Sequence, residues 1–125
     1  MSPFLARDTS DHLAANELAF AILDAFPVSA GHTLVVTRRV VPTWFDATPA
    51  EQAAVMSLVG EVKRLLDESH RPDAYNVGFN AGEAAGQTVP HLHVHVIPRY
   101  QGDASDPRGG VRWVIPGKAD YWTPQ

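Results

Sequence analysis

The chain has 125 residues, of which 45% are hydrophobic and 19% are charged, and its formal net charge is −4. This length fits one domain, because a compact chain of this size buries roughly two-thirds of its unfolded surface around a single core. The composition excludes a disordered chain, and the mildly acidic total argues against a nucleic-acid partner. The sequence contains no cysteine, which excludes disulfides, thiolate zinc sites and thiol catalysis.

No segment of the chain has the pattern of a targeting signal or a membrane span. The first residues lack a basic region followed by an apolar run, and no stretch reaches the roughly 18 apolar residues that a span needs. We therefore expect a cytoplasmic protein without a membrane partner.

The first half of the chain predicts two strands and one long helix. Residues 17–26 alternate large and small apolar side chains, and residues 32–38 are rich in β-branched side chains, so the pair is typical of a hairpin. Thr48, a following proline and Glu51 have the spacing of a capping box at a helix start. The apolar residues after it predict a helix that ends near His70.

The second half predicts two more strands around a glycine-containing loop. Residues 75–79 and 91–97 are the predicted strands, and the loop is 80–88, with the sequence NAGEAAGQT. Beyond position 99, glycine and proline interrupt the chain, which leaves 100–125 as a loosely structured extension. Strands and one main helix joined by short turns indicate an α+β domain with an antiparallel sheet.

Three histidines alternate with apolar residues in the last predicted strand. Successive side chains of a strand point to opposite faces, so His91, His93 and His95 share one face at intervals of about 6.7 Å. The opposite face is apolar. The histidine face admits three interpretations: a solvated sheet surface, a metal site, or a catalytic site.

A metal site would use neighbouring histidines of the strand. The two outer imidazoles start about 13 Å apart on a straight strand, so a third ligand would come from elsewhere, with His32 as the candidate.

A catalytic site would use His93 as a nucleophile between two histidines that donate hydrogen bonds or protons to an anionic substrate. The preceding loop favours this interpretation, because its glycines permit close backbone approach and Asn80, Gln87 and Thr88 offer donors to phosphate oxygens.

The segment NAGEAAGQTVPHLHVHVIPR resembles the signature of the histidine triad (HIT) family, and in particular its fragile-histidine-triad branch. The upstream segment AFAILDAFPVSAGHTLVV is similar to the first hairpin of that family. The resemblance covers about 19–99 and implies a single HIT domain over 1–125. It also implies a HIT-like α+β fold with about five antiparallel strands, one main helix and a short N-terminal element, paired as a homodimer.

The family resemblance implies an enzyme that acts on a small-molecule nucleotide. Such an enzyme hydrolyses or transfers a nucleotidyl group at an α-phosphorus through a covalent nucleotidyl-histidine. The substrate would be a dinucleoside polyphosphate or a nucleoside phosphoramidate. No cofactor is required, although Mg²⁺ can accompany the substrate.

The resemblance also implies a role for each matching residue. His93 falls on the nucleophile, His91 and His95 on its flanking members, and His32 on a fourth active-site histidine. The remaining positions bind substrate: the ribose at Asp24, an apolar wall for the base at Ile22, and the phosphates at Asn80, Gln87 and Thr88. Two alternatives stay open, a non-catalytic nucleotide-binding module and a histidine-ligated metalloprotein.

Overall fold

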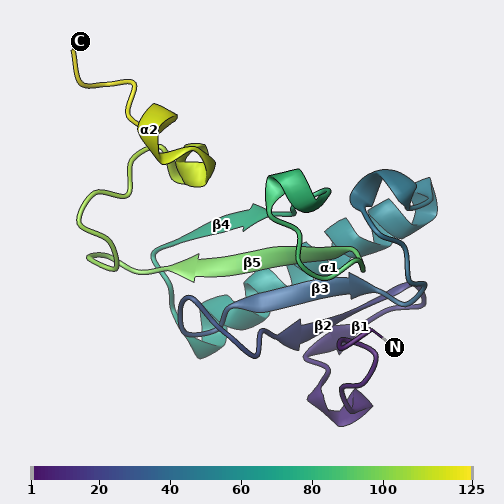
Figure 1. Ribbon diagram of the computed structural model, residues 1–125. Helices are drawn as coiled ribbons and strands as arrows, with labels where there is room; N and C mark the ends of the chain where they lie inside the picture. The colour runs from purple at the N-terminus through teal and green to yellow at the C-terminus, as the bar shows by residue number, and fades with distance from the viewer. Residues whose placement is uncertain (1, 125) are drawn as a thin grey trace.

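The computed structural model describes residues 2–124 and contains one antiparallel sheet with the strand order β1-β2-β3-β5-β4 (Figure 1). The strands are β1 Ala14–Ala15, β2 Ala19–Leu23, β3 Thr33–Thr37, β4 Ala74–Gly78 and β5 His93–Arg99. The long helix α1 is Pro49–Ser69, and the short helix α2 is Pro116–Ala119. Single 3-10 turns cover Thr9–Asp11, Trp44–Asp46, Glu83–Ala85 and Gly110–Val114. The α+β class with one main helix is confirmed.

The helix α1 begins as its capping box predicts. The Thr48 hydroxyl accepts a hydrogen bond from the Glu51 amide, and the Glu51 carboxylate accepts one from the Thr48 amide. The same carboxylate receives two bonds from the Arg39 guanidinium, at 2.7 and 3.1 Å. Arg39 is the main reason that the pKa of the buried Glu51 falls to about 2. This ion pair fixes the start of α1 beside the end of β3.

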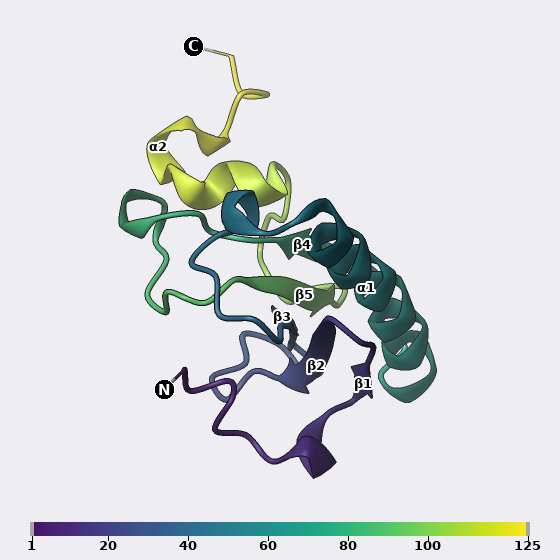
Figure 2. The ribbon, with the colours of Figure 1, turned by 90° about the vertical axis from the view of Figure 1, so that its right-hand side faces the viewer.

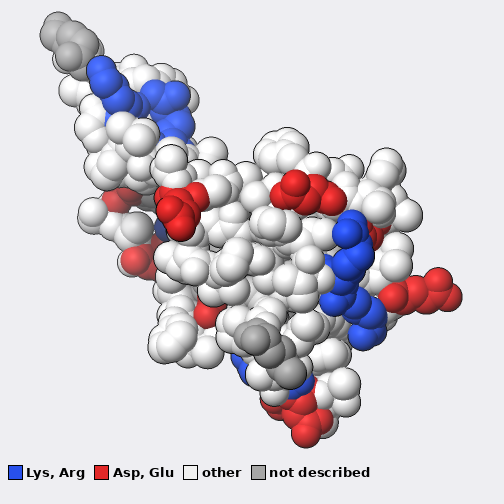
Figure 3. Space-filling model, turned by 45° about the vertical axis from the view of Figure 1, so that its right-hand side comes forward, with Lys and Arg blue, Asp and Glu red and all other residues white. Residues whose placement is uncertain are grey.

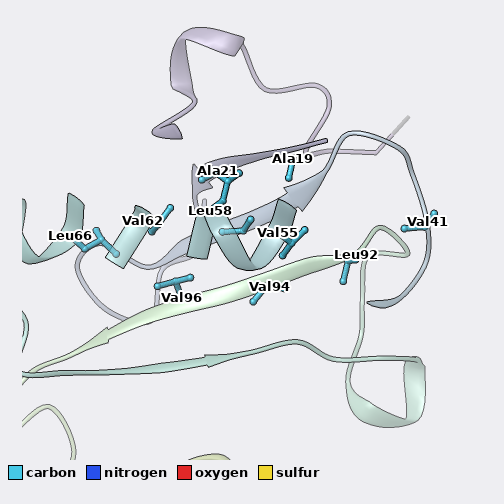
Figure 4. Packing of buried hydrophobic residues seen from close by; sticks show 11 residues of the cluster. Ala19, Ala21, Val41, Val55, Leu58, Val62, Leu66, Leu92, Val94 and Val96 are labelled. Atoms are coloured by element: carbon cyan, nitrogen blue, oxygen red, sulfur yellow. The ribbon is translucent and has the colours of Figure 1, made fainter. Parts of the chain in front are cut away.

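The main core lies between α1 and one face of the sheet (Figure 2). Figure 4 shows the helix side chains pointing toward β2 and β5. Leu92, Val94 and Val96 belong to this core, as the strand alternation predicts. The helix contributes Val55, Leu58, Val62 and Leu66, and the rest of the sheet contributes Ala19, Ala21 and Val35.

A second apolar cluster lies on the opposite face of the sheet. Phe20, Ile22, Leu34 and Val36 form it, and Phe4 of the N-terminal segment packs against it. Strands β2 and β3 are thus buried on both faces, except at Leu23.

The β2–β3 hairpin places Asp24 and His32 side by side. The Asp24 amide donates to the His32 carbonyl at 2.9 Å. In the turn, Gly31 has φ +90°, and a Cβ atom there would lie 3.1 Å from Leu66 at the end of α1. Glycine therefore meets both the backbone and the space requirement of the turn.

Three details of the fold differ from the prediction. β5 is shifted from 91–97 to His93–Arg99, because the Leu92 amide bonds to Val41 outside the ladder. β1 has only two alanines, which carry no strand pattern. The described part of the extension, 100–124, contains a 3-10 helix and α2 and projects away from the sheet in Figure 1. It carries the basic side chains seen at the upper left of Figure 3. Within residues 2–124, no helix is long and apolar enough to cross a membrane.

Candidate active site

The candidate site lies on the face of β5 that is opposite α1. There His93 pairs with Val36 and His95 with Leu34 across the β3–β5 ladder. Both imidazoles line a cavity of about 540 Å³ between the β2–β3 hairpin, the N-terminal segment and the loop before β5. Asp24, Asn80 and Thr88 line the same cavity. The fold therefore brings together residues that the sequence separates by up to about 70 positions.

The backbone fixes the tautomer of His93. Its Nδ1 atom lies 2.7 Å from the carbonyl oxygen of His91, which can only accept, so Nδ1 carries the proton. In the neutral ring, Nε2 then holds a lone pair, and no residue among 2–124 hydrogen-bonds to it. This tautomer gives His93 a free nucleophilic nitrogen beside the cavity.

A chain of hydrogen bonds likewise fixes His95. The Val28 amide donates to His32 Nδ1 at 3.1 Å, so the proton of the neutral His32 ring is on Nε2. His32 Nε2 lies 2.9 Å from His95 Nδ1 and donates to it. His95 therefore keeps its proton on Nε2, where it is available to a substrate.

Burial keeps this pair of histidines neutral. It lowers the pKa of His32, and together with the nearby imidazoles of His93 and His32 it lowers the pKa of His95 to about 4. The Asp24 carboxylate, 3.5 Å from His32 Nε2, opposes both shifts. An anionic phosphate in the cavity would act in the same direction as Asp24 and favour proton uptake by the pair.

His91 does not occupy the position expected of a proton donor to the substrate. Its Nε2 donates to the Thr37 carbonyl at 2.7 Å, and its Nδ1 accepts from the Ser2 hydroxyl at 2.6 Å. The ring is 1% exposed, and burial lowers its pKa. The side chain of His91 therefore connects the N-terminal segment to β3. Its contact with the site is made by its backbone carbonyl, which accepts the hydrogen bond from His93 Nδ1.

The loop before β5 presents two of its three predicted polar residues to the cavity. Asn80 and Thr88 line it, together with Gly86, whose φ of +96° favours glycine. The side chain of Gln87 turns inward: its oxygen accepts from the Gly82 amide, and its nitrogen donates to the carbonyls of Pro42 and Val89. Gln87 thus holds the loop in shape, and its amide group is not free for a phosphate.

The two predicted substrate-binding residues of the hairpin differ in placement. Asp24 lines the cavity, with Oδ1 accepting from the Phe26 amide at 2.9 Å. Ile22 is fully buried and is not among the lining residues. Its ladder partner Leu34 lines the cavity instead, so the expectation that Ile22 forms the wall is corrected.

The N-terminal segment supplies site residues that the sequence analysis did not find. Pro3, Phe4 and Arg7 line the cavity, and the Phe4 ring lies 4.8 Å from the His93 ring. Phe26 of the hairpin is a further lining residue. No motif marks these positions, because they lie far from the histidine strand in sequence; Phe4 and His93, for example, are 89 residues apart.

One group of side chains has the donors of a metal site. Potential ligand atoms of Asp24, His32 and His95 lie within 4.8 Å of one another. The two imidazoles are already hydrogen-bonded to each other, so a metal ion would have to replace that bond. Among residues 2–124, the cluster that could hold a metal combines His32 with one strand histidine, His95, and has Asp24 in place of a second strand histidine.

Comparison with known proteins agrees with this geometry. The HIT domain family model matches residues 7–102. Over 90 residues, 72% of this chain and 50% of the relative, the chain is 39% identical to a bis(5'-nucleosyl)-tetraphosphatase of Schizosaccharomyces pombe. It is 38% identical to an AP-4-A phosphorylase of Mycobacterium tuberculosis over 104 residues, 82% of this chain and 53% of the relative.

A solved structure extends the likeness to three dimensions. The NitFhit protein of Caenorhabditis elegans superposes with a TM-score of 0.74 at 32% identity, covering 86% of this chain and 26% of that chain. Its name agrees with the fragile-histidine-triad branch that the motif indicates. The chain spans about half the length of the two curated relatives. The matched residues, the sheet and the histidine strand together show that the chain belongs to the HIT domain family.

Proposed function

We propose that this protein is a nucleotide hydrolase or nucleotidyl transferase that forms a covalent nucleotidyl-His93 intermediate. The observation that carries the proposal is the bond from His93 Nδ1 to the His91 carbonyl, which leaves Nε2 free at the cavity. Named relatives act on dinucleoside polyphosphates, which supports a substrate of that class; a nucleoside phosphoramidate is the other candidate.

In the first step, His93 Nε2 attacks the α-phosphorus and a phosphorus–nitrogen bond forms. The anionic substrate favours uptake of one proton by the His95–His32 pair. The bond from phosphorus to the leaving group breaks, and the leaving atom takes this proton from His95 Nε2. In the second step, water attacks the phosphorus, its proton returns to the pair, and the nucleoside monophosphate leaves His93. Protons balance over the two steps, because the attacking water restores the proton that the leaving group took.

The surroundings of His93 suit this chemistry. Asn80 and Thr88 can donate hydrogen bonds to the non-bridging oxygens, and the loop that carries them is held rigidly by Gln87. Donors positioned in advance stabilise the transition state without reorganisation. On the hairpin side, Asp24 lines the cavity, and we expect its carboxylate to accept from the ribose hydroxyls.

The test is His93→Ala, assayed with a diadenosine polyphosphate and with an adenosine phosphoramidate. We expect turnover to fall by about 10⁴-fold or more, because the nucleophile is removed. Mass spectrometry after a rapid alkaline quench should find a nucleotidyl adduct in the unmodified protein and none in the variant. His70→Gln is the matched control, since His70 caps the end of α1 outside the cavity.

Two results would contradict the proposal. Undiminished turnover in His93→Ala would exclude the covalent mechanism. Tight nucleotide binding by the unmodified protein without turnover or adduct would indicate the non-catalytic binding module instead.

We also propose that the protein is a homodimer. β4 is an edge strand of the sheet, and beside it lies an apolar concave surface of about 460 Å³ that includes Val77, Ile97, Val111 and Val114. A second copy would cover these side chains. Sedimentation at the monomer mass would contradict the dimer.

The cytoplasmic location stays a prediction.

A further inference from the structure

Two concave spaces of the protein meet at His95. The first is the cavity of about 540 Å³ that His93 lines, and the second is the apolar concave surface of about 460 Å³ beside β4, which we call the β4 hollow. His95 and Asn80 line both spaces, whereas His93 lines the first and not the second. The proton donor of the proposed reaction therefore lies where the two spaces adjoin.

Gly78 leaves one flank of His95 open toward β4. In the β4–β5 ladder Gly78 is directly opposite His95, so a side chain at position 78 would lie on the histidine face, about 5 Å from His95 Cβ. A Cβ atom at this position would have no neighbour within 4 Å outside its own stretch of chain. On the other flank, Leu34 of β3 occupies the corresponding place in the ladder.

Neither the backbone nor the packing requires a glycine at position 78. The φ angle of Gly78 lies outside the left-handed region, and the space beside its Cα atom is open. A glycine weakens a strand and often marks a place where a ligand approaches closely. Gly78 itself lines the β4 hollow, so the missing side chain indicates a passage from His95 into that hollow.

We propose that the β4 hollow is the leaving-group site and that Gly78 determines which leaving groups can enter it, an inference that rests on the proposed function. The nucleoside monophosphate that becomes bonded to His93 occupies the first cavity. The leaving group lies on the far side of the phosphorus from the attacking nitrogen and must contact His95, which supplies its proton. The open flank at Gly78 is then its route into the β4 hollow.

The lining of the β4 hollow favours an uncharged, apolar leaving group. Among the described residues that line it there is no Lys, Arg, Asp or Glu, and most of the side chains are apolar, with the Phe79 ring among them. Arg99, at the end of β5, is already bonded to Asp103 and Asn76. A polyphosphate would therefore find no free cation there.

An amine with an apolar substituent satisfies these conditions. The bond from phosphorus to the amine nitrogen breaks, the nitrogen takes the proton from His95 Nε2, and the amine departs uncharged. In the proposed homodimer, the second copy would cover the outer side of the β4 hollow.

The experiment measures kcat/KM for two adenosine phosphoramidates, one with methylamine and one with 2-phenylethylamine as the leaving group. Both leaving atoms are primary alkylamine nitrogens, and hydrolysis of the His93 adduct is common to both substrates. The comparison therefore reports the fit of the leaving group. We expect the unmodified protein to prefer the phenylethyl substrate by on the order of 10-fold, because the ring is buried on binding. A carboxylate on that ring should remove the preference.

Gly78→Val places a side chain in the passage. It should lower kcat/KM for the phenylethyl substrate by about 10-fold or more, and for the methyl substrate much less. Gly78→Ala should shift the ratio in the same direction by a smaller factor, and it keeps the test available if the valine variant does not fold. Gly60→Val is the matched control, because Gly60 lies in α1 on the opposite face of the sheet. It should leave the ratio unchanged.

Three outcomes would overturn the inference. A preference of the unmodified protein for the methyl substrate would show that no site receives the larger group. An unchanged ratio in folded Gly78→Val would show that the leaving group takes another route. An equal loss for both substrates would place the effect at the histidines themselves. Turnover of neither substrate by the unmodified protein would overturn the proposed function as well. Thermal unfolding and sedimentation of each variant check the fold and the assembly.

Discussion

The two faces of β5 have opposite properties although they belong to one strand. Val94 and Val96 point into the dry core beneath α1 and have no polar partners. His93 and His95 point the other way, are partly exposed, and each form a specific hydrogen bond at a ring nitrogen. The alternation of a strand therefore separates stability from chemistry. Substitutions on the apolar face should change the free energy of unfolding, and those on the histidine face should change the rate.

Among the substitutions that compare the two faces, His95→Gln should have the largest effect, and the effect is on turnover. The variant loses the Nε2 proton donor, so turnover should fall by about 10²- to 10⁴-fold. A substrate whose leaving group needs no proton should lose much less, and this dependence identifies the donor role. The measurement is kcat for a series of substrates that differ in the pKa of the leaving group. A uniform loss across the series would exclude proton donation by His95.

The adjacent residue provides the matched control. Val96→Ala changes the opposite face of the strand at the next position. It should lower the free energy of unfolding while leaving kcat of the folded protein within about 2-fold of its normal value. A loss of kcat as large as that of His95→Gln would show that the two faces are not independent.

Leu58→Ala tests the apolar face from the side of the helix. Leu58 is fully buried between α1 and the sheet, so the truncation should cost about 2–5 kcal/mol of unfolding free energy. Urea denaturation measures the loss. Turnover per folded molecule at low temperature should be unchanged, and Leu65→Ala, a partly exposed leucine of the same helix, should cost much less.

The smallest effect that we expect is a pH dependence of the free energy of unfolding, which arises from the buried histidines. The pKa values of His32, His91 and His95 are lower in the folded protein than the unfolded value of about 6.5. The unfolded chain therefore binds more protons below that pH, and the free energy of unfolding should fall as the pH decreases from about 6.5 to 5. Urea denaturation should give a shallower slope for His95→Gln. Identical slopes would contradict a neutral buried His95.

Much of the fold follows from local sequence. The capping residues Thr48 and Glu51 fix the start of α1, and alternation separates the two faces of the histidine strand. These features depend on neighbours in sequence, so they can be predicted without knowledge of the fold. The two-residue strand β1 and the helix turns of the C-terminal extension carry no comparable local signal.

The candidate site is less predictable than the fold. The family motif brings His93, His95, His32, Asp24, Asn80 and Thr88 to attention, and the structure places all six near one cavity. The motif cannot show that the side chain of Gln87 faces its own loop or that Leu34 lines the cavity in place of Ile22. It also cannot show that Phe4 and Arg7 of the N-terminal segment line the cavity.

The sequence by itself determined the helix start, the two faces of the histidine strand and the family. Only the tertiary structure decided which nitrogen of each imidazole is free, because that depends on partners distant in the chain. His32 and His95 are 63 positions apart, and Ser2 and His91 are 89 apart. A hydrogen bond between such residues is set by the packing of the sheet. The pattern supplied the histidines, and the fold assigned their protons.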